Sequence, residues 1–314
     1  MIKLIKSTNK ELLELFHQNV ILLIFKWLEI SPSTVYSTTI FNNSTNTYNK
    51  QEIEILKIIF RKKKLKEHLN SLFDEVKLPH NNNLLLQIKS IYKYQRKQLR
   101  KGNYNIKFFS INTNFHTLFI DFFYDSLFND PSIWMTIGNT SFSKQIFIST
   151  FNLKVCPYCN IENISRSRNY KIDHFLPKSK FPLLSMYYLN LIPICEACNS
   201  FDQGKGNNFI FPIQNQFYKE IGNLIDFNYD FLNETIQLSA SKKEITNFIT
   251  LLQLENAYQA NNLFYDTISE LKVLDLILSH TSNKKETLVK YLLSLKSNNL
   301  FYLKKNYIYK YYKN

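Results

Sequence analysis

Long apolar runs are missing from this sequence. The most apolar stretch, Val20–Phe25, is followed at once by Lys26, whereas a membrane-spanning helix needs about 20 consecutive apolar residues. No signal peptide is visible at the start of the sequence. These absences argue against a membrane protein and against an oxidising compartment, and they predict a soluble, cytoplasmic protein.

Cysteine is scarce as well, because the 314 residues contain only four. All four lie in two Cys-x-x-Cys pairs, Cys156 with Cys159 and Cys195 with Cys198. Two such pairs can supply the four thiolate ligands of one tetrahedral zinc ion. A redox pair, two disulfides or four packed thiols are the alternative interpretations. The repeated spacing, with no cysteine elsewhere, favours a structural zinc site.

Acidic residues are outnumbered by basic ones. The chain has 25 Asp and Glu against 39 Lys and Arg, which gives a formal net charge of +14 and a pI near 9.4. A strongly basic chain favours a polyanionic partner, and nucleic acid is the expected one. An AT-rich genome would also raise the lysine content, so the charge supports this interpretation without proving it.

The 35 residues between the cysteine pairs contain side chains suited to catalysis. Tyr170–Pro177 alternates between polar and apolar residues and ends at a proline, which predicts a strand with Asp173 and His174 at its end. Asp173 would offer an oxygen ligand to Mg²⁺ or a similar ion, and His174 could take a proton from water. Asn199 would lie on a helix that begins at the second cysteine pair, where its side-chain carbonyl oxygen could complete the metal site.

Each of these residues also has a plainer interpretation. Asp173 and His174 could form a surface ion pair, and the asparagines could cap turns. Taken as an ordered set between and beside the cysteine pairs, however, they favour a catalytic site.

The order Asp173-His174, Asn190, Cys195-x-x-Cys198-Asn199 resembles the HNH endonuclease family, whose catalytic module is a ββα-metal finger. The resemblance covers about 50 residues of the chain. It implies that His174 is the general base and that Asp173 and Asn199 hold one divalent metal. It also implies that Asn190 orients the histidine loop. Asparagine at the last position favours Mg²⁺ or Mn²⁺.

Basic side chains around this stretch could contact neighbouring phosphates, although solvated surface positions explain them equally well. The usual basic residue of the family's helix is delayed here to Lys205, and Gly204 and Gly206 are expected to end that helix early. The candidate nucleic-acid contacts are Lys178, Lys180, Lys205, Arg166 and Arg168.

The rest of the chain predicts helices and one hairpin. Apolar residues recur at helical spacing over 12–30, 53–73, 84–99 and 115–128, and residues 227–238 alternate as a hairpin followed by helices. The basic runs 61–64 and 93–101 fall on predicted helices, where they could follow a phosphate backbone or form solvated faces. Residues 302–313 interleave tyrosines with lysines and favour a packed terminal helix over a base-stacking surface.

The expected fold class is therefore α+β: a mostly helical chain with a central ββα-metal (HNH) nuclease module that is stabilised by a zinc site with four cysteine ligands. Three regions are expected: a helical region 1–150, the HNH nuclease module 151–212, and a hairpin with C-terminal helices over 213–314.

The resemblance implies a metal-dependent DNA endonuclease with a histidine general base and a single divalent metal. The tail over 250–256 also resembles the segment that follows the HNH module in some phage-defence nucleases. The large helical flanks and the absence of a sequence-reading module suggest a nuclease controlled by another protein, and the nearest analogy is the HNH subunit of a Septu-type anti-phage system, which acts with a partner ATPase. The chain has no Gly-x-x-x-x-Gly-Lys-Ser/Thr phosphate loop of its own. The alternatives are a stand-alone restriction-like or mobile-element nuclease, and a catalytically silent, zinc-stabilised nucleic-acid-binding protein.

Overall fold

A computed structural model of the protein describes residues 9–30, 47–164, 170–215, 217–259, 262–296 and 298–312. The chain forms two compact units. The helical unit contains Ser7–Thr150 and His174–Leu191, and the cysteine unit contains Phe151–Asp173 and Ile192–Asn314. The three-region division at residues 150 and 212 remains a prediction.

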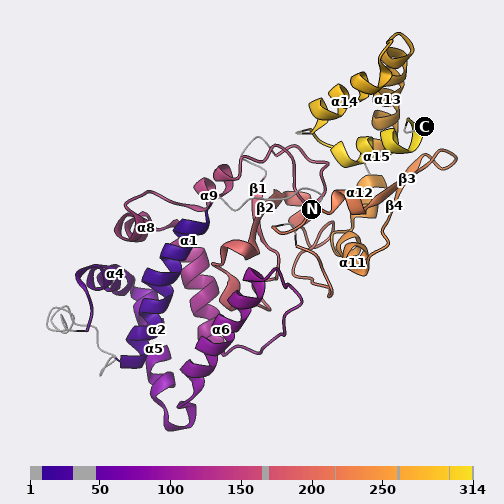
Figure 1. The fold of residues 1–314 in the computed structure, drawn as a ribbon. Helices are drawn as coiled ribbons and strands as arrows, with labels where there is room; N and C mark the ends of the chain where they lie inside the picture. Colours follow the sequence, from indigo (N-terminus) through magenta and orange to yellow (C-terminus); the bar gives the residue numbers. More distant parts are fainter. Residues whose placement is uncertain are drawn as a thin grey trace. The chain divides into compact units, whose positions relative to one another are not determined.

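The first part of the helical unit consists of amphipathic helices. Apolar residues at three- and four-residue spacing give the α-helices buried apolar faces, which drive these helices together. The elements, which Figure 1 labels in part, are α1 (Lys10–Phe16), η1 (His17–Ile21), α2 (Leu22–Ile30), α4 (Lys50–Arg61), α5 (Lys63–Lys77), η2 (Pro79–Asn81) and α6 (Leu84–Arg100).

The helix expected over 53–73 is divided at Lys62. Lys62 has φ −80° and ψ 101°, an extended conformation that ends α4 and precedes α5. Its ammonium group pairs with Asp130, the residue that caps α8 (Pro131–Gly138). This tertiary contact accompanies a change of direction that the helical spacing of the apolar residues does not indicate.

The second part of the helical unit packs aromatic side chains into a common core. Phe16, Phe25, Phe119, Phe123 and Trp134 are at most 1% exposed, and neighbouring rings lie 5.1 to 6.2 Å apart. The elements are α7 (Thr113–Thr117), η3 (Leu118–Ser126), η4 (Leu127–Asn129), α8 (Pro131–Gly138), α9 (Lys144–Thr150), η6 (Pro182–Leu184) and η7 (Tyr188–Asn190).

The cysteine unit contains most of a two-stranded sheet and a complete hairpin. Strand β1 (Tyr170–His174) pairs with β2 (Leu191–Cys195), and β2 leads directly into α10 (Glu196–Asn199). Strands β3 (Asp226–Asp230) and β4 (Thr235–Ser239) pair antiparallel, as the sequence predicts.

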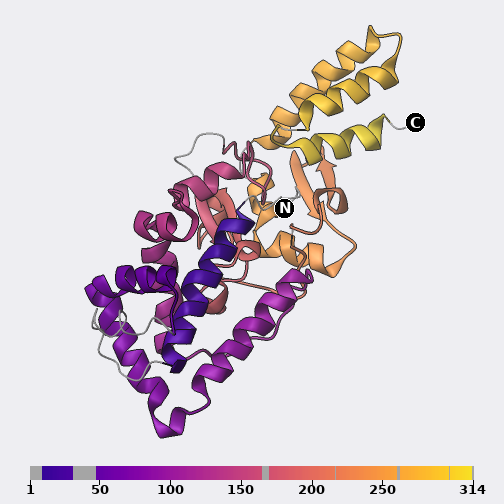
Figure 2. The same cartoon turned by 60° about the vertical axis from the view of Figure 1, so that its left-hand side comes forward.

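Helices complete the cysteine unit: α11 (Lys243–Leu251), α12 (Leu254–Gln259), α13 (Leu263–Ser279), α14 (Lys284–Leu295) and α15 (Phe301–Tyr311). The last three are light orange to yellow in Figure 2. Helices α13 and α15 form a small core of Leu271, Leu274, Leu278 and Ile308, and α14 packs against it. The terminal helix packs through Tyr302, which is 3% exposed, and Leu303, which is fully buried, whereas Tyr309 and Tyr311 are 48% and 52% exposed.

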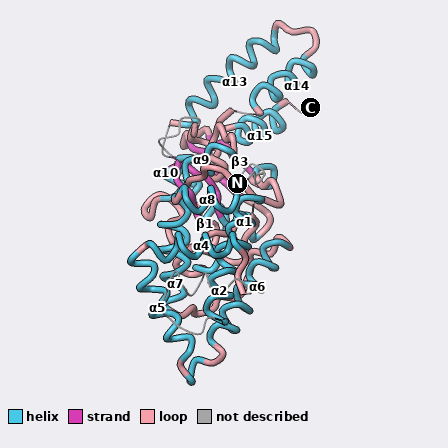
Figure 3. The backbone as a smooth tube through the Cα atoms, turned by 90° about the vertical axis from the view of Figure 1, so that its left-hand side faces the viewer, coloured by secondary structure: helices cyan, strands magenta, loops and turns pink. Residues whose placement is uncertain are grey.

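Helices dominate the described part of the chain, and the strands form two small antiparallel sheets, which is compatible with the α+β class (Figure 3). Among the helices that the structure describes, none combines the length and apolar character needed to span a membrane.

Candidate metal centre and catalytic residues

The first cysteine pair lies in a tight turn of the cysteine unit. Val155 and Asn163 form an isolated antiparallel bridge, and the Cys156 N–H donates to the Glu162 carbonyl at 2.9 Å. Asn160 closes the turn with φ 60°, a left-handed conformation that asparagine tolerates better than most residues. The local backbone therefore brings Cys156 and Cys159 to the same side of the turn.

The second pair lies where a strand changes into a helix. Cys195 ends β2 and caps the N-terminus of α10, because its sulfur accepts the Cys198 N–H at 3.5 Å. Further backbone N–H groups point at the other sulfurs: Ile161 donates to Cys159 and Cys195 donates to Cys156, both at 3.4 Å. Donors aimed at sulfur stabilise thiolates.

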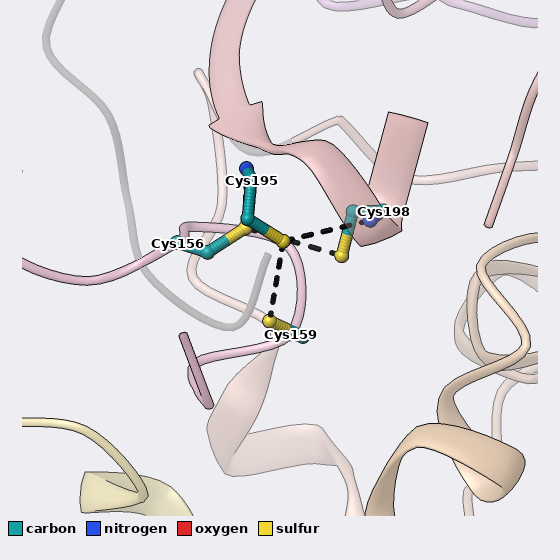
Figure 4. A group of neighbouring side chains, drawn as sticks. All are labelled: Cys156, Cys159, Cys195 and Cys198. Atoms are coloured by element: carbon teal, nitrogen blue, oxygen red, sulfur yellow. Dashed lines mark hydrogen bonds between the residues drawn. The ribbon is translucent and has the colours of Figure 1, made fainter. Parts of the chain in front are cut away.

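The four sulfur atoms converge on one point, with the ligand atoms all within 4.8 Å of one another (Figure 4). The Cys156 and Cys198 sulfurs lie 3.9 Å apart, and those of Cys159 and Cys195 lie 4.0 Å apart. A tetrahedral zinc ion with Zn–S bonds of about 2.3 Å requires sulfurs about 3.8 Å apart. The four cysteines therefore fit a metal such as zinc.

The protonation of the cluster also favours a cation. Burial acts to raise the pKa of the Cys156 thiol, but hydrogen bonds from the other three cysteines outweigh it and hold that pKa well below its ordinary value. Hydrogen bonds with Cys156 and its neighbours hold the pKa values of Cys159 and Cys198 well above theirs. Without a metal, these directions favour one thiolate beside protonated thiols, whereas a bound divalent cation would allow the other thiols to ionise.

Asp173 is buried in the cysteine unit and bonded through both carboxylate oxygens. Lys205 Nζ lies 2.7 Å from Oδ1, and the Tyr158 hydroxyl donates to Oδ2 at 2.5 Å. Asp173 is 4% exposed and Lys205 is 1% exposed. Burial, and next the Asp173 carboxylate, hold the pKa of Tyr158 well above its ordinary value, which keeps the hydroxyl a donor.

Gly204 allows Lys205 to reach this position. A Cβ atom at Gly204 would meet the carbonyl oxygens of Ala197 and Cys198 at 2.4 Å, so no larger residue fits there. The next residue then donates its backbone N–H to the Cys198 carbonyl at 3.0 Å. The expectation that Gly204 and Gly206 end the helix is wrong, because α10 already ends at Asn199, before an extended residue. Glycine is required at position 204 instead because the backbone of Ala197 and Cys198 lies too close for a side chain.

His174 is the last residue of β1, as the sequence predicts, and it packs inside the helical unit. Its Nε2 lies 3.0 Å from the Ser185 carbonyl, and a carbonyl only accepts, so Nε2 carries a proton. In the neutral imidazole, Nδ1 is then the basic nitrogen. The Ser185 hydroxyl is held by the Phe119 carbonyl at 2.8 Å, and the Tyr124 ring meets the imidazole edge-on at 4.4 Å.

Asn190 binds the segment that follows His174. Its Oδ1 accepts the Leu176 N–H at 2.7 Å, and its Nδ2 donates to the carbonyls of Leu176 and Leu184 at 3.0 and 3.3 Å. Its own carbonyl accepts the Phe175 N–H at 2.9 Å. Asn190 is fully buried, so these bonds are not exchanged for water. The side chain therefore fixes the backbone on both sides of the loop.

Two lysines lie against the ring that packs on His174. Lys144 Nζ lies 3.8 Å from the centre of the Tyr124 ring, Lys178 Nζ lies 4.7 Å from it, and both lysines pair with Asp125. Burial, and then the charge of Lys178, hold the pKa of Lys144 below its ordinary value despite Asp125. Sequence reasoning missed Lys144, because no spacing connects it with a residue 30 positions further along.

The remaining predicted residues occupy different settings. Asn199 ends α10 and is half-buried, and Lys180 is exposed. The burial of Asp173 and His174 excludes an exposed ion pair as their setting. Of the predicted set, the structure brings together the four cysteines, and it joins Asp173 to Lys205. Arg166 and Arg168 lie outside the described residues.

The comparisons with known proteins give two partial similarities. No family model and no solved structure matches the chain. The chain is 32% identical over 71 residues to the Septu protein PtuB of Bacillus thuringiensis, which is 23% of this chain and 26% of that protein. It is 40% identical over 50 residues to protein ea31 of Escherichia phage lambda, 16% of each chain. The chain thus matches at most about a quarter of the length of these relatives.

Proposed function

We propose that this chain is an HNH-type endonuclease that hydrolyses phosphodiester bonds in DNA, with a structural zinc ion and a catalytic Mg²⁺ or Mn²⁺. The setting of His174 is the observation that carries the proposal. A buried imidazole with Nε2–H fixed on the Ser185 carbonyl presents Nδ1 as a base. The buried side chain of Asn190 fixes the backbone of the loop that follows His174, which supports the proposal.

In the proposed reaction His174 takes a proton from the attacking water at Nδ1. The bond from Nε2–H to Ser185 stabilises the imidazolium that forms, since a carbonyl accepts more strongly from a charged ring. Asn190 keeps the loop, and with it Ser185, at a constant position relative to the ring. Lys178 and Lys144 are placed around Tyr124, where they could neutralise a bound phosphate.

Asp173 and Asn199 would hold the divalent metal, because carboxylate and amide oxygens are the donors that hard cations prefer. When bound, such an ion neutralises charge on the scissile phosphate and on the leaving oxygen. A carboxylate can accept about four hydrogen bonds or ligands, and Asp173 uses two positions for Lys205 and Tyr158. Lys205 therefore balances the buried negative charge of Asp173 before any metal arrives, and does not serve as a surface phosphate contact.

The similarity to the Septu protein supports a role in anti-phage defence. Because that similarity spans a quarter of either chain, we propose the defence role and a partner ATPase by analogy with the Septu-type systems. The charge of +14 is consistent with a nucleic-acid substrate.

Plasmid cleavage by the purified protein with Mg²⁺ or Mn²⁺ tests the proposal, with His174→Ala as the variant. We expect the wild type to cut and His174→Ala to lose at least about 100-fold in rate, while its zinc content is unchanged. Equal cleavage by both proteins would remove His174 from its role. If neither cuts, addition of candidate partner proteins distinguishes a nuclease that needs activation from a silent binding protein.

A further inference from the structure

The helical unit contains a basic pocket that the proposed nuclease chemistry does not use. It has a volume of about 480 Å³ and lies between the segment His17–Phe25 and helix α6. Helices α2 and α6 pack against each other there (Figure 1). Leu22 and Phe25 contribute apolar surface. Pockets of about 300 to 1,000 Å³ with apolar walls and a few fixed polar groups are typical small-molecule sites.

Helix α6 contributes five cations to this pocket: Lys89, Lys93, Arg96, Lys97 and Arg100. Lys89, Lys93 and Lys97 are spaced four residues apart, so they share one face of the helix and their charges repel one another. Among the described residues, two carboxylates form ion pairs with the set, Glu29 with Lys89 and Glu14 with both arginines. The pocket therefore has three positive charges in excess. Within the described part of the chain, neither Lys93 nor Lys97 forms an ion pair.

Arg96 is a buried cation of the pocket and is held by several contacts. Arg96 is 6% exposed, donates to Glu14 at 2.6 Å and to the Tyr92 hydroxyl at 2.8 Å, and lies over the rings of Tyr92 and Tyr187. The Tyr92 hydroxyl accepts from Arg96 and so donates to His17 Nδ1 at 2.7 Å. These bonds fix the donors before a ligand arrives, which lowers the cost of binding.

Two arginines of the pocket contribute to a lowered pKa of the neighbouring His17. Burial first, and then the charges of Arg96 and Arg100, lower the pKa of His17 to about 3. His17 is therefore neutral at pH 7, and the Tyr92 hydroxyl keeps its proton because burial raises its pKa to about 12. Both groups present hydrogen bonds without adding charge, so the positive potential comes from the lysines and arginines of α6.

We propose that this pocket binds a phosphate ester of nucleotide size. Clustered lysines and a fixed arginine are the groups that recognise phosphate oxygens. The excess of three charges suits a di- or triphosphate, and the apolar side chains of Leu22 and Phe25 suit the remainder of such a ligand. A simple solvated helix face would need neither a pocket nor a buried arginine network behind the lysines. The proposal does not depend on nuclease activity.

Titration of the full-length protein with ATP, inorganic phosphate and a single-stranded 20-nucleotide DNA tests the proposal. The variant is Lys93→Gln with Lys97→Gln, two exposed lysines of the pocket. The matched control is Lys63→Gln with Lys64→Gln, which removes the same charge from exposed positions of α5 in the same unit. Circular dichroism verifies that both variants fold.

We expect ATP to bind more tightly than phosphate, and the pocket variant to lose about tenfold in affinity for ATP. The control should change less than about twofold. The affinity should fall as salt is raised, because the contacts are ionic. Equal losses in both variants, no binding of ATP or phosphate by the folded wild type, or binding of the DNA alone would each overturn the proposal.

Discussion

Lys205 Nζ lies 2.7 Å from Asp173 Oδ1, and the two side chains are only 1% and 4% exposed. Removing one member of a buried pair leaves the other charge without compensation, which costs about 3–5 kcal/mol. Lys205→Met should therefore lower the free energy of unfolding by that amount, as measured by urea denaturation. Adding Asp173→Asn should recover part of the loss, because the remaining amide carries no charge.

The matched control for this pair is Lys171→Met. Lys171 pairs with Glu196 at 3.4 Å in the same unit, but the two side chains are 49% and 70% exposed. Exposed pairs contribute about 0–1 kcal/mol, so this variant should unfold almost like the wild type. Equal losses in Lys171→Met and Lys205→Met would contradict the assignment of a buried, mutually dependent pair.

The four cysteines should bind one zinc ion per chain, and loss of one ligand should destabilise the cysteine unit. Cys198→Ser is expected to lower the zinc content measured by mass spectrometry and to lower the melting temperature, since the binding energy of a structural zinc ion contributes to folding. Ser200→Ala, a half-buried position just after α10, is the control. A wild-type protein that purifies without metal and remains folded would refute the zinc centre.

Asn190→Ala should destabilise the helical unit by about 3 kcal/mol, because it leaves a buried N–H and two buried carbonyls without partners. Those groups belong to Leu176 and Leu184. Thermal denaturation measures the loss. Asn228→Ala, an exposed asparagine of β3, is the control and should change stability little. A similar small change in both would mean that Asn190 does not fix the loop.

Sequence reasoning succeeded where the geometry is local. Two Cys-x-x-Cys pairs predict a four-sulfur cluster, because each pair is arranged within four residues. The cluster then requires only that the two pairs come together. The end of β1 at His174 and the helix after Cys195 are local in the same sense. The hairpin of β3 and β4 is predicted by its alternation and short turn.

The environment of the candidate site could not be predicted from the sequence, because it depends on contacts between distant segments. Nothing near Asp173 in the sequence indicates that Tyr158 and Lys205 will take both carboxylate oxygens. Lysine is also so frequent in this chain that its position carries little information. Lys144 reaches the Tyr124 ring only through the packing of α9 in the helical unit.

If Lys144 and Lys178 bind phosphate, replacing both with glutamine should weaken DNA binding by about tenfold at low salt. The dependence of affinity on salt should also become less steep, since each phosphate contact releases counterions. Lys10→Gln with Lys50→Gln, which removes the same charge from exposed positions of α1 and α4 in the same unit, is the control. A fluorescence anisotropy titration measures both quantities. An unchanged salt dependence in the double variant would argue that these lysines only pack on Tyr124.

His17 should make the stability of the helical unit depend on pH. Its pKa is lowered from 6.5 to about 3 in the folded protein by burial and then by Arg96 and Arg100. Below pH 6.5 the unfolded chain takes up a proton that the folded protein does not, so this contribution is present above pH 6.5 and is lost as the pH falls toward 3. Because His17 is partly exposed, we expect the loss at pH 5 to be about 1–2 kcal/mol.

His17→Gln tests this dependence, since glutamine stays neutral at every pH. Urea denaturation at pH 7 and pH 5 should show a smaller loss of stability on acidification in the variant than in the wild type. His80→Gln, which replaces an exposed histidine of the same unit, should keep the wild-type loss. Arg96 and Arg100 remain charged over this range, so they cannot produce the difference themselves. An equal loss in the wild type and His17→Gln would place the pH dependence on other groups.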